Sequence, residues 1–362
     1  MKKLVMAIVS FSFLQAVSAQ DGWSRRSTSV GITPDKAASR LSFPKQFQLF
    51  NLNSETLRLK LFGVVDNAVS HSAIVSLPNA EGVMEQFEIF EASNFEPALQ
   101  ARFPQIRAFS GRGISDPSAM LKLSYSPQGI QTMVIRSNDK AAEFMEPYSS
   151  DHTVYAVYTT QRSPGKIPWT CSTVDERMAV GLDNQVNNTG ITARSGADLK
   201  TMRLAQSVTA EYSNYFGATS AAQVGLVLAA VNATMTRCNG VYEKDLALHL
   251  NLVANTTSVF YYTASSDPYS AASTGAGGAW NGELQSTLTS VIGEANYDVG
   301  HLFGASGGGG NAGCIGCVCT NNQKGSGYTS PADGIPQGDN FDIDYVVHEI
   351  GHQLGANHTF SM

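Results

Sequence analysis

One run near the end of the chain has residue types and spacing suited to binding a metal. It begins at His348 and reads His-Glu-Ile-Gly-His-Gln-Leu-Gly-Ala-Asn-His. On a helix, positions four apart lie on one face, so His348 and His352 can present two imidazoles to the same ion. Gly355 permits the left-handed backbone that ends a helix and turns the chain back. That turn would bring His358 round as a third ligand, and we predict that the three histidines bind Zn²⁺.

Glu349 is the candidate catalytic residue. Three neutral ligands leave the charge of the ion undiminished and its fourth position open to water, whose pKa zinc lowers to about 7. Glu349 directly follows the first ligand, so its carboxylate can take the proton of that water as general base and pass it to a leaving amine. H-E-x-x-H alone recurs by chance, but the extended run fixes more positions and is a strong signal.

Two acidic residues just before these histidines have alternative interpretations. Asp344 lies one turn before His348 on the same helical face, so it can orient that imidazole. Capping of the helix N-terminus is at least as good an explanation for Asp342 or Asp344. The side chains expected to bury the rest of the helix are Tyr345, Val346, Val347, Ile350 and Leu354.

The extended run matches the metzincin signature H-E-x-x-H-x-x-G-x-x-H, and residues 199–358 resemble the reprolysin-like (adamalysin-type) zinc metallopeptidases of secreted bacterial proteins. The other segments that carry this resemblance are residues 239–243, 297–303 and 341–345. Adamalysins usually have Asp after the third histidine, where this chain has Thr359. The resemblance implies a metalloendopeptidase acting on protein or peptide substrates. It also implies a cleft in which an extended substrate adds to the sheet edge near residues 297–303.

The residues after position 199 alternate between strand and helix patterns. Apolar residues at helical spacing predict helices over residues 224–242 and 284–291, and alternation predicts a strand over residues 246–252. A further strand is expected at residues 297–303 and a long loop at residues 304–340. We therefore predict an α/β (α+β) fold: a metzincin-like N-terminal catalytic subdomain with a mixed sheet and a zinc-binding active-site helix.

The earlier part of the chain has a different pattern. Short alternating segments separated by turn signals cover residues 45–160 and predict a β-rich domain; they include an alternating run at Leu57, Leu59 and Leu61. A polar, glycine-containing stretch at residues 183–198 follows. We predict three parts: a signal peptide (1–19), a β-rich prodomain (20–190) and a zinc metallopeptidase catalytic domain (195–362). Together they indicate a zymogen, with cleavage near Arg194 by an activating protease.

The N-terminus has the features of a secretory signal peptide. Lys2 and Lys3 precede a short apolar core, and small residues follow before Gln20. This core is shorter than the roughly 20 residues that a membrane-spanning helix needs. We therefore predict a secreted, extracellular protein with no stable membrane span. The net charge of −6 and the lack of a dense Lys/Arg run argue against nucleic acid as a partner.

The five cysteines are expected to form disulfides, because an exported chain enters an oxidising compartment. Cys314, Cys317 and Cys319 lie together in the predicted loop, where a zinc knuckle would lack a fourth ligand. The odd number leaves one thiol without a partner in this chain. Cys171 has two alternatives: it forms a disulfide, or its thiolate binds the zinc and blocks the water site.

Two other functions are alternatives to a peptidase. One is an exported binding or adhesion module with a structural or vestigial zinc site, and the other is a zinc hydrolase that acts on something other than peptides. Glu349 argues against the first, because a structural site has no need of a carboxylate beside the metal.

The position of the motif in the chain raises a further expectation. Metzincins resemble one another in a Met-containing turn beneath the zinc, well after the third ligand, and Met362 is too close to His358 to fill that role. We expect that turn after Met362, so that the catalytic domain is truncated after the third zinc ligand. We also expect Val346, Ile350 or Leu354 to be partly exposed and residues 20–362 alone to bind zinc weakly.

Overall fold

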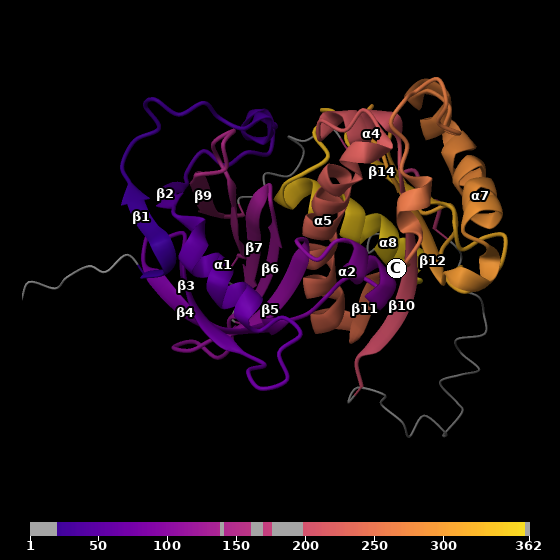
Figure 1. Cartoon of the computed structure of the whole chain (residues 1–362). Coiled ribbons are helices and arrows are strands. Elements are labelled where there is room, and N and C mark those ends of the chain that lie inside the picture. The colour runs from indigo at the N-terminus through magenta and orange to yellow at the C-terminus, as the bar shows by residue number, and fades with distance from the viewer. Residues whose placement is uncertain (1–19, 138–140, 161–168, 176–197, 359–362) are drawn as a thin grey trace, which may run out of the picture.

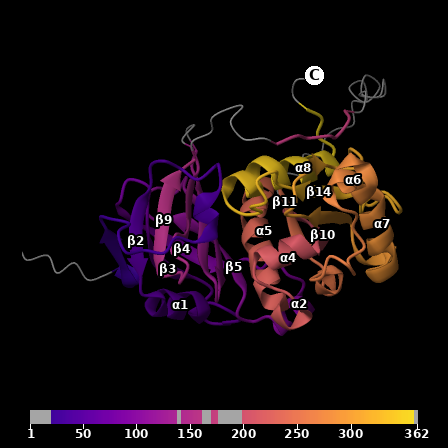
Figure 2. The ribbon, with the colours of Figure 1, turned by 90° about the horizontal axis from the view of Figure 1, so that it is seen from above.

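The computed structural model describes residues 20–137, 141–160, 169–175 and 198–358 (Figure 1). The predicted signal peptide, the predicted domain boundary at residues 190–195 and the expected cleavage site at Arg194 lie outside the described residues. An N-terminal region, within residues 20–160, and a C-terminal region, residues 198–358, lie side by side (Figures 1 and 2).

The N-terminal region is built on a nine-stranded sheet whose neighbouring strands are all antiparallel. Successive side chains point to opposite faces: in β4 (Met84–Glu91), Phe87 and Ile89 are buried whereas Gln86 and Glu88 are exposed. The predicted β-rich N-terminal part is confirmed. In spatial order the strands are β1 (Trp23–Arg26), β2 (Gln48–Leu52), β9 (Val154–Thr159), β8 (Glu143–Pro147), β7 (Gly129–Ile135), β6 (Met120–Ser126), β5 (Arg107–Gly113), β4 and β3 (Ala73–Pro78).

The strand expected at Leu57, Leu59 and Leu61 is wrong, because these residues lie in helix α1 (Ser54–Gly63). Leu57 and Leu61, four residues apart, are buried on one side of the helix, whereas Leu59 is exposed. The Asn53 side chain accepts a hydrogen bond from the first turn and begins the helix. The spacing of Leu57 and Leu61 is therefore compatible with a helix as well as with a strand. The other helical segments of this region are η1 (Gln20–Gly22), η2 (Lys36–Ser39) and α2 (Pro97–Arg102).

The C-terminal region contains a five-stranded sheet that is parallel except at one edge, where its last pair of strands is antiparallel. The predicted mixed sheet is therefore confirmed. In spatial order its strands are β11 (Leu248–Leu252), β10 (Lys200–Val208), β12 (Val299–Phe303), β14 (Gly327–Ser330) and β13 (Gly309–Asn311).

Helices cover both faces of this second sheet. Leu204 of β10 packs in an apolar cluster with α5 (Val224–Leu246), whereas the next residue, Ala205, packs on the other face with α7 (Trp280–Val291). A largely parallel sheet buried on both faces is typical of an α/β arrangement, and the predicted fold class is confirmed. The remaining helical segments are α4 (Ala210–Tyr215), η3 (Ala221–Gln223), η4 (Thr256–Val259), α6 (Ala272–Thr274), η5 (Gly275–Ala279), η6 (Glu294–Asn296), η7 (Asn340–Val346) and α8 (Val347–Gln353).

Two expectations about the C-terminal sheet are corrected. Residues 304–340 are not a continuous loop, because they contain β13 and β14. These two strands add to the sheet beyond β12, which pairs with β10 on one side and β14 on the other. The segment at residues 297–303 therefore lies inside the sheet, and the expectation that a substrate adds to an edge there is wrong. The edge on that side is β13.

Helix α5 lies between the two sheets. It packs against β5, β6 and β7 of the N-terminal region and against β11 of its own region. At Gly240, an added Cβ would lie 2.6 Å from Met133 Cε and 2.8 Å from Lys122 Cγ. Glycine therefore lets the helix approach the N-terminal sheet more closely than any other residue would. The two regions share a packed interface.

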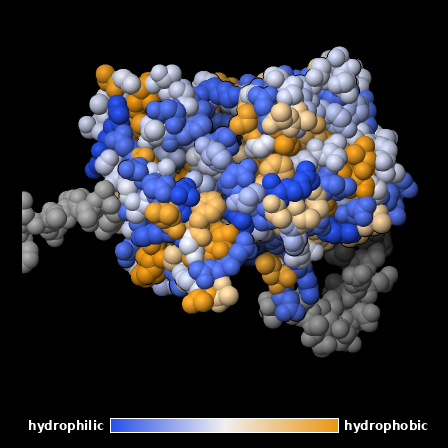
Figure 3. Space-filling model, in the orientation of Figure 1, coloured by the Kyte–Doolittle hydropathy of each residue, from blue (hydrophilic) through white to orange (hydrophobic). Residues whose placement is uncertain are grey.

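Within the described residues, no helix has the length and apolar character needed to cross a bilayer. The face of the molecule drawn in Figure 3 carries hydrophobic residues in small groups interspersed with hydrophilic ones.

Candidate metal centre

The first two predicted zinc ligands lie on α8, which continues directly from the π-helical segment η7. His348 and His352 are one turn apart in α8, as predicted. Gly355 follows the end of the helix with a φ of +116°, in the range that favours glycine. The predicted helix and the predicted turn after it are confirmed.

The underside of this helix is covered. Val346 and Ile350 are fully buried in the apolar cluster that α5 and β10 also enter, and Leu354 is partly buried against it. The expectation that these residues would be exposed is wrong for Val346 and Ile350. The described chain itself supplies their cover, because α8 packs across α5 and the sheet.

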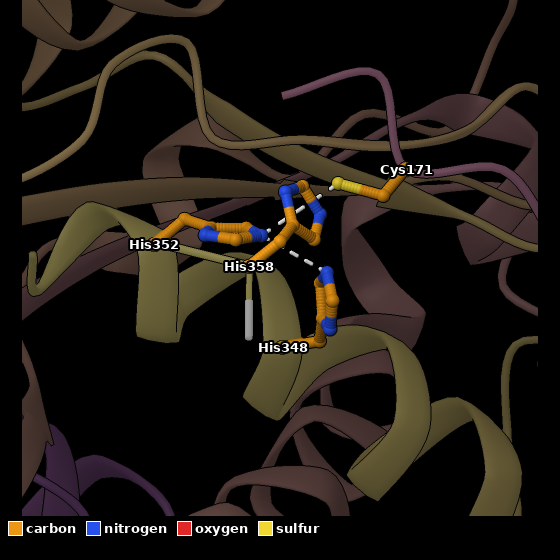
Figure 4. A group of neighbouring side chains, drawn as sticks. All are labelled: Cys171, His348, His352 and His358. Carbon is orange, nitrogen blue, oxygen red and sulfur yellow. Dashed lines mark hydrogen bonds between the residues drawn. The ribbon is translucent and has the colours of Figure 1, made fainter. Parts of the chain in front are cut away.

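Four side chains converge above α8 (Figure 4). The three predicted histidines are joined by Cys171, and one potential ligand atom from each lies within 4.8 Å of all the others. The Nε2 atoms of His348 and His352 are 3.0 Å apart, and Cys171 Sγ is 3.7 Å from His352 Nε2. The structure thus brings together residues more than 170 positions apart in sequence.

This donor set is compatible with zinc. Tetrahedral zinc sites combine imidazole nitrogens at about 2.0–2.1 Å with thiolate sulfur at about 2.3 Å, which places the ligand atoms about 3–4 Å from one another. The separations of 3.0 Å between the two imidazole nitrogens and 3.7 Å between sulfur and nitrogen lie in that range. Three histidines and one cysteine would fill all four positions of such an ion.

The surroundings of His348 and His352 favour the neutral imidazole, which is the form that binds metal. Burial, with smaller effects of His352 and His358, lowers the pKa of His348 to about 4, and burial also lowers the pKa of His352. The Nδ1 atom of His352 lies 2.6 Å from the carbonyl oxygen of Ala356, so Nδ1 carries the proton and Nε2 is free to bind an ion. His358 Nδ1 likewise lies 2.9 Å from a carboxylate oxygen of Asp175.

Glu349 lies on the same helix with its side chain fully buried. The Thr173 hydroxyl donates a 3.0 Å hydrogen bond to its Oε2. Burial raises the pKa of this carboxyl to about 7, against the lowering effect of hydrogen bonds from Cys171 and Thr173. The carboxylate lies against the edge strand, because a Cβ added to Gly310 of β13 would come within 2.4 Å of Glu349 Oε1.

Residues 170–173 run along that same edge strand. The Gly310 N–H donates to the Thr170 carbonyl at 3.0 Å, and the Ser172 N–H donates to the Gly310 carbonyl at 2.9 Å, in parallel pairing. The Thr173 hydroxyl also accepts a 2.8 Å hydrogen bond from the Ala312 N–H. This segment therefore occupies the sheet edge beside Glu349.

Alternate residues of an extended segment point the same way, and here they reach three parts of the site. Cys171 lies in the metal-binding group, Thr173 bonds Glu349, and Asp175 bonds both the backbone N–H and the Nδ1 of His358, each at 2.9 Å. Thr173 and Asp175 were not predicted as site residues from the sequence. The two-residue spacing from Cys171 was the signal that could have found them.

The Cys171 thiol is free of any disulfide. Burial, followed by the charge of Glu349, raises its pKa to about 12. A bound divalent cation acts in the opposite direction, because it stabilises the thiolate. Without a bound cation, the surroundings of Cys171 therefore favour the neutral thiol. A bound cation would favour the thiolate.

Trp169, just before this segment, packs against the helix that carries the histidines. Its ring stacks on Tyr345 at 4.7 Å between centroids and meets the His348 ring edge-on at 4.8 Å. Such aromatic contacts hold the His348 imidazole in place and cover it from one side.

Two acidic residues, Asp342 and Asp344, precede α8. Asp342 is buried and accepts hydrogen bonds of 2.8 Å from Arg237 and 2.7 Å from Thr234, both on α5. Its interpretation as a helix cap is wrong, because the buried guanidinium of Arg237 requires a counter-charge. Asp344 lies inside η7, whose N-cap is Asp339, so its interpretation as a helix cap is also wrong. Its predicted role in orienting His348 stays a prediction.

One predicted feature of the cysteine-containing segment is confirmed. Cys314 and Cys317 form a disulfide. Cys238 is buried and unpaired, and Cys319 is exposed and unpaired. The alternative of a disulfide at Cys171 is wrong for the described residues.

Residues 198–362 match the model of the metallo-peptidase family M12B, reprolysin-like. This match covers the whole C-terminal region, including the helix that carries His348, Glu349 and His352. A search of the curated proteins finds no match to the chain. The family match confirms the resemblance that the histidine motif suggested.

Proposed function

We propose that this chain, whose residues 198–362 match the model of the reprolysin-like metallo-peptidase family, is a secreted zinc metalloendopeptidase made as a zymogen. The observation that carries the proposal is the convergence of His348, His352 and His358 beside the buried carboxylate of Glu349, at an edge strand of the sheet. Histidine ligands, a general base and a strand edge are the three components that metal-assisted peptide hydrolysis requires.

Zinc, when bound by the three histidines, lowers the pKa of water and polarises a peptide carbonyl. Residues of the chain would transfer the protons and bind the peptide. Glu349 takes the proton of the attacking water and delivers it to the departing amine; its raised pKa, about 7, suits both directions of transfer near neutral pH. The backbone of Gly310 offers an N–H and a carbonyl to an extended peptide, the groups that residues 170–172 use here.

The uncut chain would be latent because residues 170–173 occupy the site. Cys171 would supply the fourth ligand to the metal, which leaves no position for water. Thr173 holds the carboxylate of Glu349 by a hydrogen bond, and the same segment fills the strand edge that a substrate needs. We propose that the N-terminal region is a prodomain and that an activating protease cuts near Arg194. The Cys171 segment must then leave before peptides can bind.

One alternative has a specific observation in its favour. A closed set of four protein ligands is also the arrangement of structural zinc sites, so a binding or adhesion module with a structural ion would show the same cluster. The two functions differ in Glu349. A structural site does not require a carboxylate with a raised pKa beside the ligands.

The test uses the protein loaded with zinc, cut within residues 176–197 and freed of the N-terminal fragment. We expect zinc-dependent casein hydrolysis that a chelator abolishes. Glu349→Gln should keep the zinc and lose at least about a thousandfold in rate, because the amide cannot act as a base. Glu211→Gln, an exposed residue of α4, is the matched control. Equal rates for Glu349→Gln and wild type would contradict the mechanism and favour a structural ion.

A further inference from the structure

The connection between β4 and β5 leaves the N-terminal sheet and enters the C-terminal region. It carries helix α2, and three of its apolar side chains, Phe95, Leu99 and Ile106, are at most 4% exposed. All three belong to the apolar cluster formed by α5, β10 and β11, rather than to the core of the sheet from which they come. We call residues 93–106 the anchor segment.

The anchor segment extends the C-terminal sheet. The Leu252 N–H of β11 donates to the Asn94 carbonyl at 2.7 Å, and the Glu96 N–H donates to the Leu252 carbonyl at 3.0 Å. Phe95 and Leu252 thus form a parallel bridge on the side of β11 that β10 leaves free. Addition of a strand to a sheet edge is a recurrent way of binding an extended peptide.

The Asn94 side chain is recognised by α5. It is 2% exposed, and its Nδ2 donates to Asn232 Oδ1 at 3.0 Å and to Thr236 Oγ1 at 2.8 Å. Its Oδ1 accepts from Asn239 Nδ2 at 2.9 Å. Both donors and the acceptor of the amide are used, so these α5 side chains select asparagine over an acid or an apolar residue.

Polar contacts surround the buried part of the anchor segment. Glu96 Oε2 accepts a 2.8 Å hydrogen bond from the Ala254 N–H just after β11. Arg102 donates to the Ala254 carbonyl at 3.3 Å and to Thr257 Oγ1 at 3.2 Å. A buried centre surrounded by polar contacts is the usual organisation of a specific protein–protein interface.

The anchor segment is separate from the metal group. In Figure 2, α2 lies at the opposite side of the C-terminal region from α8. We infer that the C-terminal region carries a second peptide-binding site, at the free edge of β11. Its ligand is the anchor segment of the chain's own N-terminal region, and this contact keeps the N-terminal region bound after the chain is cut within residues 176–197.

This inference rests on the proposed zymogen and adds a step to its activation. A cut within residues 176–197 leaves the Cys171 segment attached to the N-terminal region. The anchor segment, together with the contacts of α5 with β5, β6 and β7, holds that region beside the metal group. A tethered ligand has an effective concentration in the millimolar range, so the Cys171 segment rebinds faster than a free peptide could. The cut alone therefore leaves the site blocked, and activity appears only when the anchor segment is released.

The experiment places a site for a specific protease within residues 176–197 of the full chain and follows the two fragments after cutting. We expect them to elute together in gel filtration. Asn94→Ala and Phe95→Ala should each raise the dissociation rate of the cut complex by about tenfold or more, because both remove contacts at the buried centre. Ile74→Ala, at an exposed position on β3, should leave that rate unchanged.

A second measurement needs no substitution. Amide hydrogen exchange of Leu252 and Glu96 should stay as slow in the cut complex as in the uncut chain, because both N–H groups bond across the anchor contact. Fragments that separate on cutting, unchanged dissociation in both variants, or fast exchange at both amides in a complex that still co-elutes would each overturn the inference. None of these readouts needs enzymatic activity. An inactive protein with a stable cut complex would therefore count against the proposed function alone.

Discussion

The two regions place their polar side chains differently. The N-terminal sheet has a largely apolar core, and its buried Lys122 forms an ion pair with Glu243 of the C-terminal region. In the C-terminal region both faces of the sheet are covered, and polar groups such as His301, Asp342 and Glu349 are buried with hydrogen-bond partners. Buried polar groups are costly unless they are paired. The comparison indicates that the C-terminal region is built around its site, whereas the N-terminal region is built to present surfaces to it.

The N-terminal part of the chain reaches the site through one short segment. Within the described residues, the only member of the metal-binding group outside the C-terminal region is Cys171, and Thr173 and Asp175 accompany it. One region would thus supply the chemistry and the other would supply its restraint.

Loss of a C-terminal ligand should have the largest effect. His352→Ala removes one of three histidine ligands and should weaken zinc binding on the order of a hundredfold or more, because the remaining donors no longer form a closed set. Competition with a chromophoric chelator measures the affinity. His71→Ala, at an exposed position of the N-terminal region, should bind zinc as wild type does. Equal affinity for His352→Ala would show that the ion is bound elsewhere.

Loss of the N-terminal ligand should have the opposite consequence for activity. Cys171→Ala removes the ligand that holds residues 170–173 at the metal, so this segment should leave the edge strand more often. The uncut variant should therefore hydrolyse casein at least about ten times faster than the uncut wild type. Cys319→Ala removes the exposed thiol and serves as the control. A Cys171→Ala chain as inactive as wild type would mean that the thiol does not restrain the site.

The hydrogen bonds of Thr173 should matter less than the thiol. Thr173→Val keeps the shape of the side chain but loses its bonds to Glu349 and to the Ala312 N–H. A hydrogen bond contributes about 1 kcal/mol net, so the activity of the uncut chain should rise only about fivefold. Thr170→Val, at an exposed side chain of the same segment, controls for the substitution. An increase as large as that of Cys171→Ala would contradict the ranking.

Acid sensitivity should trace to a buried residue of the C-terminal sheet. Burial lowers the pKa of His301 from its ordinary 6.5 to about 4. The folded chain keeps this side chain neutral while the unfolded chain takes up a proton below pH 6.5. Its contribution is therefore unaffected above pH 6.5, and stability is lost between pH 6.5 and 4, by about 1.4 kcal/mol per pH unit at most.

This effect can be isolated by urea unfolding at pH 7.5 and pH 5 in the presence of a chelator, which removes the metal contribution. His301→Leu should be less stable at pH 7.5, because Gln353 and Thr329 lose their partner, and its stability should fall less between the two pH values. His71→Ala should keep the full dependence. A His301→Leu chain with the wild-type pH dependence would assign the acid sensitivity to other groups.

Much of the C-terminal region could be predicted because its elements have clear local signals. The leucine alternation gave β11, helical spacing gave α5 and α7, and the histidine motif identified α8. The N-terminal leucines at 57, 59 and 61 fit two periods equally well, and tertiary packing of α1 decided between them. Short runs of this kind are ambiguous because residues four apart lie on one side of a helix and also on one face of a strand, so Leu57 and Leu61 fit both.

The site was predicted in part for a related reason. The three histidines and Glu349 lie within a single local motif, so spacing alone brings them together. Thr173, Asp175 and the edge strand β13 depend on pairing between segments far apart in the chain. No local pattern contains that information. The glycines of β13 in particular resemble a loop, and only their pairing with β14 makes them a strand.

In the proposed mechanism, Cys171 and the three histidines together bind the zinc in the latent chain. After activation, the three histidines of the C-terminal region bind it without the thiolate. Zinc-edge X-ray absorption of the uncut, zinc-loaded chain tests this most directly. The account predicts one sulfur ligand at about 2.3 Å with nitrogen ligands at about 2.0–2.1 Å. After cutting and removal of the N-terminal fragment, sulfur should be absent from the spectrum and hydrolysis should appear. A spectrum without sulfur in the uncut chain, or with sulfur in the active enzyme, would contradict the account.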